Sequence, residues 1–165
     1  MRGWQLSDQV RLRQAYDWAD KHSDDRRTKV GALLVSRGLI ARAANQLPPG
    51  VKKNRVRVAH DTKRPFMEHA ERGVIYAAAS VGLPTKGATL YAPWFACEDC
   101  ARAIICAGIT KVIGHQQVWD KTPERWKSVI NVGLEMMMEA GIELDYYDGP
   151  IGGCKNLFDG EWWTP

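Results

Sequence analysis

Apolar and polar residues alternate along the chain with two different spacings, one typical of helices and one typical of strands. The helical pattern marks four segments, 6–22, 67–81, 98–107 and 126–140. Short apolar runs predict five strands, at 30–35, 39–44, 88–92, 110–114 and 142–147. The first two strands flank the turn Ser36-Arg37-Gly38 and are expected to form a hairpin. Strands that alternate with helices after a hairpin favour an α/β fold, a three-layer α/β/α sandwich around a five-stranded mixed sheet.

Three segments lack a clear periodicity. Residues 45–66 form a long, polar, cationic loop, and a loop of this length in a compact domain is usually functional or mobile. Residues 114–125 read as irregular, and the tail 149–165 is rich in glycine. The tail also carries Trp162 and Trp163, which either dock on a neighbouring subunit or cover this one.

Length and composition are those of a globular protein. The chain has 165 residues, which predicts one domain over 1–165 with a core at about 6–148. Hydrophobic residues make up 45% and charged residues 25%, so a disordered or fibrous chain is not expected. No apolar run is long enough to span a membrane, and the first residues lack the apolar core of a secretory signal. A cytoplasmic protein is therefore expected.

Charge and cysteine spacing narrow the function further. The net charge of +4 suits an anionic ligand but is too small to indicate a nucleic-acid partner. Three of the four cysteines crowd into residues 97–106, which is not the spread of a disulfide framework. A reducing compartment fits better, with Cys97 and Cys100 in metal or redox chemistry.

One set of residues points to a zinc site with an open position. His69, Cys97 and Cys100 are three zinc ligands, which leaves the fourth tetrahedral position for water. Zinc lowers the pKa of water towards neutrality, and Glu71, two residues after the histidine, can carry its proton. Two unrelated buried cysteines or a redox Cys-x-x-Cys pair are the alternatives, and the redox pair would leave His69 and Glu71 without a role.

The predicted elements bring these residues together. The helix that His69 opens runs roughly 18 Å away from the site, and the strand at 88–92 with its flanks returns about the same distance. Cys97 and Cys100 then begin the next helix at spacing i, i+3, so both thiols can share one face of its first turn. The positive end of that helix favours thiolate over thiol.

At this point the sequence resembles a known family. His69-Ala70-Glu71, the Cys97-x-x-Cys100 pair and the run Ile104 to Ile113 are similar to the deoxycytidylate (dCMP) deaminase branch of the cytidine deaminase superfamily, whose zinc motif is H-x-E with C-x-x-C. Thr28 to Ala32 and Glu139 to Ile142 fit the same pattern. The resemblance covers roughly residues 6–148.

The resemblance implies a zinc-dependent hydrolase that removes the amino group of a deoxycytidine monophosphate. By this likeness Glu71 protonates the base and relays a proton to the leaving ammonia, and Asn45 contacts the sugar. The resemblance also implies that the backbone carbonyl of Trp94 or Phe95 accepts a hydrogen bond from the exocyclic amine. The two rings are also candidates to line the pocket of the base and stack on it. Core packing is the alternative for both rings. A homo-oligomer built on dimers, with a hexamer as one form, is also implied.

The sequence departs from the family pattern at two positions. Ala96 stands where the family has proline, and Gly73 stands where it has asparagine. Glycine costs about 1 kcal/mol in a helix interior, so something favours it there. Extra room for a 5-substituted cytosine, such as that of 5-methyl-dCMP, is one interpretation, and closer packing against a neighbouring element is the other.

Further substrate contacts and functions complete the set of hypotheses. A phosphate needs cations, and Arg26, Arg27 and Arg55 are the first candidates. His115 follows a strand at the sheet edge where ligands bind, although a surface histidine is the alternative. Deamination of a base in RNA or single-stranded DNA and a non-catalytic, zinc-structured binding module are the two alternative functions.

Overall fold

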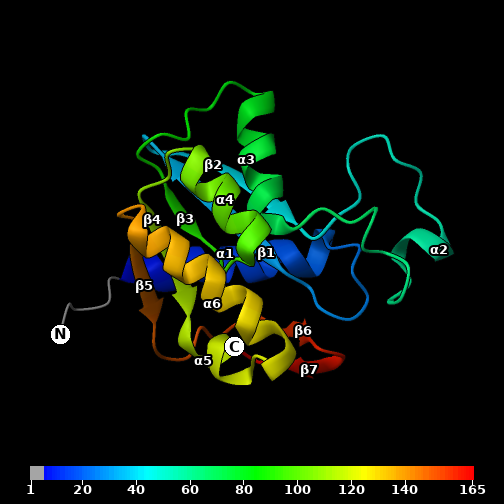
Figure 1. The fold of residues 1–165 in the computed structure, drawn as a ribbon. Coiled ribbons are helices and arrows are strands. Elements are labelled where there is room, and N and C mark those ends of the chain that lie inside the picture. The colour runs from blue at the N-terminus through cyan, green and yellow to red at the C-terminus, as the bar shows by residue number, and fades with distance from the viewer. Residues whose placement is uncertain (1–5) are drawn as a thin grey trace.

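A five-stranded mixed sheet forms the centre of the protein, as the computed structural model of residues 6–165 shows (Figure 1). Its strand order is β2-β1-β3-β4-β5. The strands are β1 (Gly31–Ser36), β2 (Leu39–Ala44), β3 (Thr89–Tyr91), β4 (Lys111–His115) and β5 (Glu143–Tyr147). β1 pairs antiparallel with β2 and β3, whereas β3, β4 and β5 run parallel. The predicted mixed sheet is confirmed.

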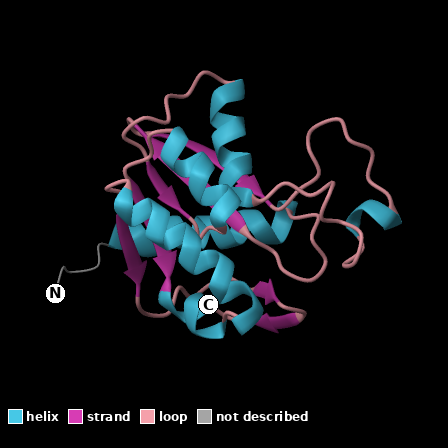
Figure 2. Ribbon diagram, in the orientation of Figure 1, coloured by secondary structure: helices cyan, strands magenta, loops and turns pink. Residues whose placement is uncertain are grey.

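Helices cover both faces of this sheet (Figure 2). The helices are α1 (Leu6–His22), α2 (Arg55–Val58), α3 (Ala70–Ser80), α4 (Glu98–Cys106), α5 (Gln116–Lys121) and α6 (Glu124–Glu139). One apolar cluster joins α1 and α5 to one face, and a second joins α3, α4 and α6 to the other. Central strands that are buried on both faces read as continuous apolar runs, which is what β1 shows. The three-layer prediction is also confirmed.

Three elements lie in segments that were expected to be irregular, and the first is the four-residue helix α2 within the expected loop 45–66. Residues 116–121 form the short helix α5, although 114–125 was expected to lack regular structure. The tail folds into a hairpin of β6 (Asn156–Phe158) and β7 (Glu161–Trp163). Asp159 and Gly160 form its turn with φ of 50° and 89°, the left-handed pair that a tight hairpin turn requires.

The start of α3 is set by a contact with the preceding loop. Gln46 and Glu68 exchange two backbone hydrogen bonds of 3.2 and 2.8 Å, so the chain is still extended before His69. α3 therefore begins at Ala70, three residues later than the expected helix start at Met67. This places His69 at the N-cap.

None of the helices described is long and apolar enough to cross a lipid bilayer. The first residues, on which the expected absence of a secretory signal rests, lie outside the described part of the chain.

The packing of α1 on the sheet depends on Gly31. A Cβ atom at this position would lie 2.1 Å from the carbonyl oxygen of Ala15, a backbone atom of α1. We expect Gly31→Ala to lower the free energy of unfolding by about 1–3 kcal/mol, because α1 must move away from β1. Urea unfolding of the zinc-loaded protein measures the change. Gly73→Ala serves as the comparison, since its new Cβ would meet Ala43 Cβ at 3.2 Å, and an effect at Gly31 no larger than at Gly73 would contradict the prediction.

Candidate metal centre and active site

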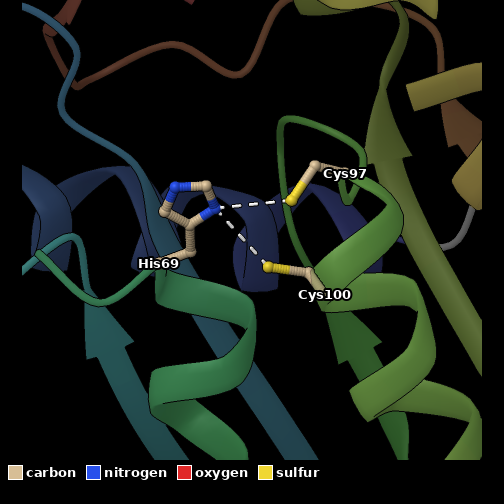
Figure 3. A group of neighbouring side chains, drawn as sticks. All are labelled: His69, Cys97 and Cys100. Atoms are coloured by element: carbon tan, nitrogen blue, oxygen red, sulfur yellow. Dashed lines mark hydrogen bonds between the residues drawn. The ribbon is translucent and has the colours of Figure 1, made fainter. Parts of the chain in front are cut away.

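The N-termini of α3 and α4 lie side by side and carry the predicted metal ligands (Figure 3). His69 is the N-cap residue of α3, and Cys97 is the N-cap residue of α4. Both have extended backbone conformations, and neither side chain caps its own helix, which leaves both side chains to face one another. Cys100 follows one turn into α4 and is fully buried.

The three ligand atoms have the spacing of a zinc site. His69 Nδ1 lies 3.6 Å from Cys97 Sγ and 3.5 Å from Cys100 Sγ. Zinc–nitrogen and zinc–sulfur bonds of ordinary length at a tetrahedral angle would separate nitrogen from sulfur by about 3.6 Å. Within the described residues, these three side chains are the group able to hold a metal ion. The residues present therefore fit zinc.

The surroundings of Cys97 favour its thiolate form. The Cys100 thiol hydrogen-bonds to Cys97, which lowers the pKa of Cys97 to about 4 and raises that of Cys100. The hydrogen bond with Cys97 also raises the pKa of His69. A metal ion takes cysteine as thiolate and histidine as neutral imidazole, so it would release the protons that these groups now share.

Glu71 lies in the first turn of α3 and is 5% exposed. Burial raises the pKa of its carboxyl group to about 7, although the charge of His69 acts in the opposite direction. A carboxyl group with a pKa near neutrality exchanges protons readily in both directions. The residue thus has the environment of a proton carrier, next to the three ligands.

A hydrogen bond to Asn45 fixes the α3 end of the centre. Asn45 Oδ1 accepts a hydrogen bond of 3.0 Å from the Ala70 backbone N–H, one of the groups that a helix start leaves without a partner. Ala70 follows the ligand His69, so this hydrogen bond puts Asn45, the predicted sugar contact, beside that ligand. The Asn45 side chain is 8% exposed. Its Nδ2 group is the other polar end of the side chain.

Arg72 connects the two ligand-bearing helices. Its Nε lies 2.7 Å from Glu68 Oε1, and its Nη1 lies 3.7 Å from Asp99 Oδ2 on α4. Glu68 Oε1 also accepts from the His69 backbone N–H at 2.9 Å. These charge-assisted contacts hold the backbone of one ligand against the helix that carries the other two.

Trp94 and Phe95 lie before the ligand Cys97 and differ in their surroundings. Phe95 is 3% exposed, and its ring packs on Tyr146 at 4.3 Å between centroids. Trp94 is half-buried; its indole N–H donates to Thr122 Oγ1 at 3.0 Å, and its ring meets Phe158 edge-to-face at 4.9 Å. The Phe95 ring is therefore in the core, while its backbone carbonyl remains a candidate contact.

The three candidate phosphate-binding arginines lie in different places. Arg55 begins α2, which lies in the middle of the long loop and projects from the body of the protein (Figure 1). Arg26 is exposed in the loop before β1. Arg27 follows it, and its Nε lies 3.0 Å from Asp159 Oδ1 at the tip of the tail hairpin.

His115 lies in the core rather than in the candidate site. It is fully buried at the end of β4. Its Nδ1 shares a hydrogen bond of 2.7 Å with Tyr16 Oη, and its Nε2 lies 2.9 Å from the Gly149 carbonyl oxygen. Trp163 stacks on the ring at 6.1 Å. Both ring nitrogens have protein partners, so neither is available to a substrate. His115 is also not a surface histidine.

Gly73 serves close packing between a helix and the sheet. A Cβ atom there would lie 3.2 Å from Ala43 Cβ on β2 and 4.0 Å from the Ala44 carbonyl oxygen. The position thus faces the edge strand, which supports the packing interpretation of this departure. It supplies no argument for a 5-substituted base.

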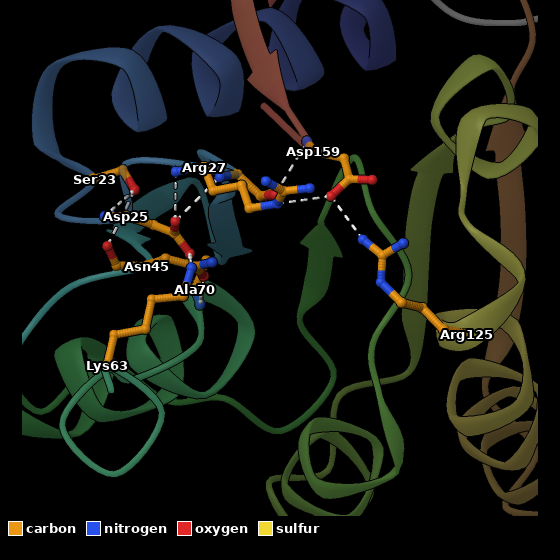
Figure 4. Close-up of polar contacts among 9 residues, drawn as sticks. Ser23, Asp25, Arg27, Asn45, Lys63, Ala70, Arg125 and Asp159 are labelled. Atoms are coloured by element: carbon orange, nitrogen blue, oxygen red, sulfur yellow. Dashed lines mark hydrogen bonds and ion pairs between the residues drawn. The ribbon is translucent and has the colours of Figure 1, made fainter. Parts of the chain in front are cut away.

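The sequence patterns did not single out Arg125 and Asp159, which form an ion-pair cluster with Arg27. Asp159 Oδ1 accepts from Arg27 at 3.0 Å and from Arg125 Nη2 at 2.6 Å, so two guanidinium groups meet on one oxygen atom (Figure 4). Asp159 was hidden in a tail without periodicity. The Asp159-Gly160 dipeptide was the available signal, since it is typical of a hairpin turn.

Comparison with known proteins places the chain in a family. It belongs to the family described as the cytidine and deoxycytidylate deaminase zinc-binding region, which it matches over residues 6–116. An uncharacterized deaminase from the luxG 3′ region of Aliivibrio fischeri is 30% identical over 125 residues, which are 75% of this chain and 82% of that protein. Human deoxycytidylate deaminase is 34% identical over 101 residues, 56% of each chain.

Phage relatives match over a shorter stretch. The deoxycytidylate deaminase of phage T4 is 38% identical over 69 residues, 41% of this chain and 35% of the phage protein. The match to its phage T2 counterpart spans 36% of that protein, so both cover about a third of the curated relative's length.

A solved structure supports the fold. The dCMP deaminase of cyanophage S-TIM5, in complex with dCMP and dUMP, superposes with a TM-score of 0.72. Its sequence is 24% identical, and the superposition covers 88% of this chain and 100% of that one.

We expect the purified protein to contain one zinc ion per chain, held by His69, Cys97 and Cys100. Cys100→Ala should lose this zinc, because two remaining ligands do not close a stable site. Cys106→Ala is the matched control, since Cys106 is a free, exposed cysteine at the other end of α4. Metal analysis after gel filtration measures the content, and a chelator should lower the melting temperature of the wild type. Zinc retained by Cys100→Ala would contradict the assignment.

Proposed function

We propose that the protein catalyses the zinc-dependent hydrolysis of dCMP to dUMP and ammonia. The observation that carries this proposal is the triangle of His69, Cys97 and Cys100 with the buried carboxyl group of Glu71 beside it. Three protein ligands leave a position for water, as in catalytic zinc sites. The relatives called deoxycytidylate deaminase support the choice of a monophosphate.

Each residue has a role that its position supports. Zinc, when bound, supplies the Lewis acidity that makes a water molecule nucleophilic near neutral pH. Glu71 would take a proton from that water and give it to N3 of cytosine, and would later carry the second proton, from the hydroxyl oxygen now on C4, to the leaving amino group. The water oxygen becomes bonded to C4, the C4–N bond breaks, and ammonia leaves. The carbonyl of Trp94 or Phe95 accepts from the exocyclic amine.

Substrate binding uses the polar groups next to the ligands. Asn45 contacts the sugar, since its Oδ1 is held by the Ala70 N–H and its Nδ2 is the remaining donor. Arg27 is the phosphate candidate that we favour: its backbone N–H donates to Asp25 Oδ1 at 2.8 Å, and the nearby Ser23 hydroxyl donates to the Asn45 carbonyl oxygen at 3.1 Å (Figure 4). Arg26, in the loop before β1, and Arg55, at the start of α2, are further candidates for a contact with the phosphate.

The base of a polynucleotide is the less favoured substrate. The net charge of +4 is modest, and the relatives of known activity act on a mononucleotide by name. We also propose unsubstituted cytosine, because Gly73 faces β2. A cytoplasmic, reducing location fits the four free cysteines. A homo-oligomer built on dimers remains part of the proposal.

Glu71→Gln should reduce kcat for dCMP by about 10²- to 10⁴-fold, because an amide cannot transfer the proton. The zinc content should stay at the wild-type value, since Glu71 is not a ligand. Glu135→Gln on the exposed side of α6 is the control and should leave kcat unchanged. Full activity of Glu71→Gln with zinc bound would refute the catalytic role and favour a zinc-structured binding module.

A substrate panel tests the choice of monophosphate. We expect the absorbance change of deamination with dCMP, a lower rate with 5-methyl-dCMP and much lower kcat/KM values with deoxycytidine, dCTP and a single-stranded oligonucleotide. Turnover of the oligonucleotide alone would favour nucleic-acid editing. A rate with 5-methyl-dCMP above that with dCMP would restore the 5-substituted base as the substrate.

A further inference from the structure

Three arginines from distant segments are linked through Asp159 and Trp126. Arg27 precedes β1, Arg64 belongs to the long loop, and Arg125 lies in the first turn of α6. Arg64 lies over the Trp126 ring at 5.7 Å, and Trp126 meets Trp94 edge-to-face at 5.6 Å. Trp94 is three residues before the ligand Cys97, so the ring contacts lead from this cationic cluster to the segment that carries the ligand.

Asp159 of the tail hairpin joins two of these arginines. The hydrogen bonds from Arg125 and Arg27 outweigh burial and lower the pKa of its carboxyl group, which is therefore ionised at neutral pH. The guanidinium groups of Arg27 and Arg125 share the Asp159 carboxylate, so these three side chains together keep a net charge of +1. Arg27 and Arg125 are 42% and 56% exposed, which leaves their other N–H groups accessible to a ligand.

The hairpin is held in place by its backbone. Lys29 N donates to the Leu157 carbonyl and Gly160 N donates to the Arg27 carbonyl, both at 2.8 Å. Asp159 N donates to Thr28 Oγ1 at 3.1 Å. Next to Asp159, the Phe158 ring packs on Trp94. Asp159 is therefore fixed against the segment that carries Arg27 and against the segment that leads to Cys97.

We propose that Arg27 and Arg125, aligned by Asp159, form the site for the 5′-phosphate of the substrate. The inference rests on the proposed function and names the groups that select a monophosphate over a nucleoside. Arginine forks match phosphate oxygens, and a fixed pair loses less side-chain entropy on binding than two mobile ones. Arg125 and Asp159 contact the phosphate site from segments beyond residue 116, where the family match ends. Asp159 is a positioning residue, since it acts through the two arginines.

The competing explanation is that these ion pairs do no more than dock the hairpin. Ion pairs with exposed members contribute little to stability, and the backbone contacts already hold the hairpin. The two explanations differ in substrate discrimination, because docking alone does not distinguish dCMP from deoxycytidine.

The test compares kcat/KM for dCMP with kcat/KM for deoxycytidine in the zinc-loaded full chain. Arg125→Ala and Arg27→Ala should each lower the ratio of the two values by about tenfold to a hundredfold, mainly through KM for dCMP. Arg125→Lys should recover part of the ratio, since it keeps the charge but loses the fork. Lys127→Ala is the matched control, because Lys127 forms a surface ion pair with Glu124 at 3.2 Å on the same helix.

Binding without turnover provides a second measurement. Calorimetry with dUMP and deoxyuridine should show the same loss of phosphate preference in Arg125→Ala, with the melting temperature as the check on folding. Asp159→Asn should raise KM for dCMP by a smaller factor, because both arginines remain but lose their common anchor. A fall in that KM would overturn the positioning role, since the carboxylate would then be a competitor of the phosphate.

The outcomes separate the two proposals. A wild type that prefers dCMP, with an unchanged ratio in Arg27→Ala and Arg125→Ala, overturns the phosphate site and leaves the proposed function in place. A wild type that turns over both substrates equally well overturns the phosphate site and the choice of a monophosphate, while deamination itself stands. A reduced ratio in the two variants and an unchanged ratio in Lys127→Ala supports the phosphate site.

Discussion

The structure depends on bringing one nitrogen and two sulfur atoms to within 4.8 Å of one another from two different helices. A soft cation accepts little error in these distances. The fold meets this demand with rigid elements: His69 and Cys97 are the N-cap residues of adjacent helices, and β3 returns the chain between them. Because both ligands sit at helix starts, the positive ends of α3 and α4 also face the two sulfur atoms.

Close approaches of backbone to backbone follow from this demand. A Cβ at Gly133 of α6 would lie 2.7 Å from the Ala96 carbonyl oxygen, so α6 packs directly on the segment that leads to Cys97. Gly31 allows α1 the same closeness on the other face of the sheet. The Arg72 contacts and the Asn45 hydrogen bond then hold the α3 side. Dense packing on both sides explains how ligands at helix ends, where chains usually fray, can keep a fixed geometry.

The sequence contained most of the metal centre and less of what surrounds it. Periodicity predicted α1 at Leu6–His22. The lengths of the predicted elements put the His69 and Cys97 segments at neighbouring helix starts, because those lengths limit where the chain can return. His115 could not be assigned in this way, since its burial depends on Tyr16 and Gly149, 99 and 34 residues away. The same holds for Arg125 and Asp159, whose contact exists only once the tail has folded back. Local sequence patterns therefore predict metal ligands on adjacent elements, whereas they do not predict contacts between residues of distant loops.

In the proposed enzyme, the residues for the chemistry and some of the residues for phosphate binding come from different parts of the chain. The groups that would perform the chemistry lie within residues 6–116, the stretch that matches the family. The proposed phosphate site takes Arg125 and Asp159 from beyond it. The guanidinium groups of Arg27 and Arg125 meet on Asp159 Oδ1, and the neighbouring Phe158 ring packs on Trp94. Since Asp159 reaches this place through backbone contacts with residues 27–29, changes in the hairpin turn can alter phosphate recognition without moving a zinc ligand. Substrate preference can thus change within such a fold while the metal centre stays constant, because the two are held by separate sets of contacts.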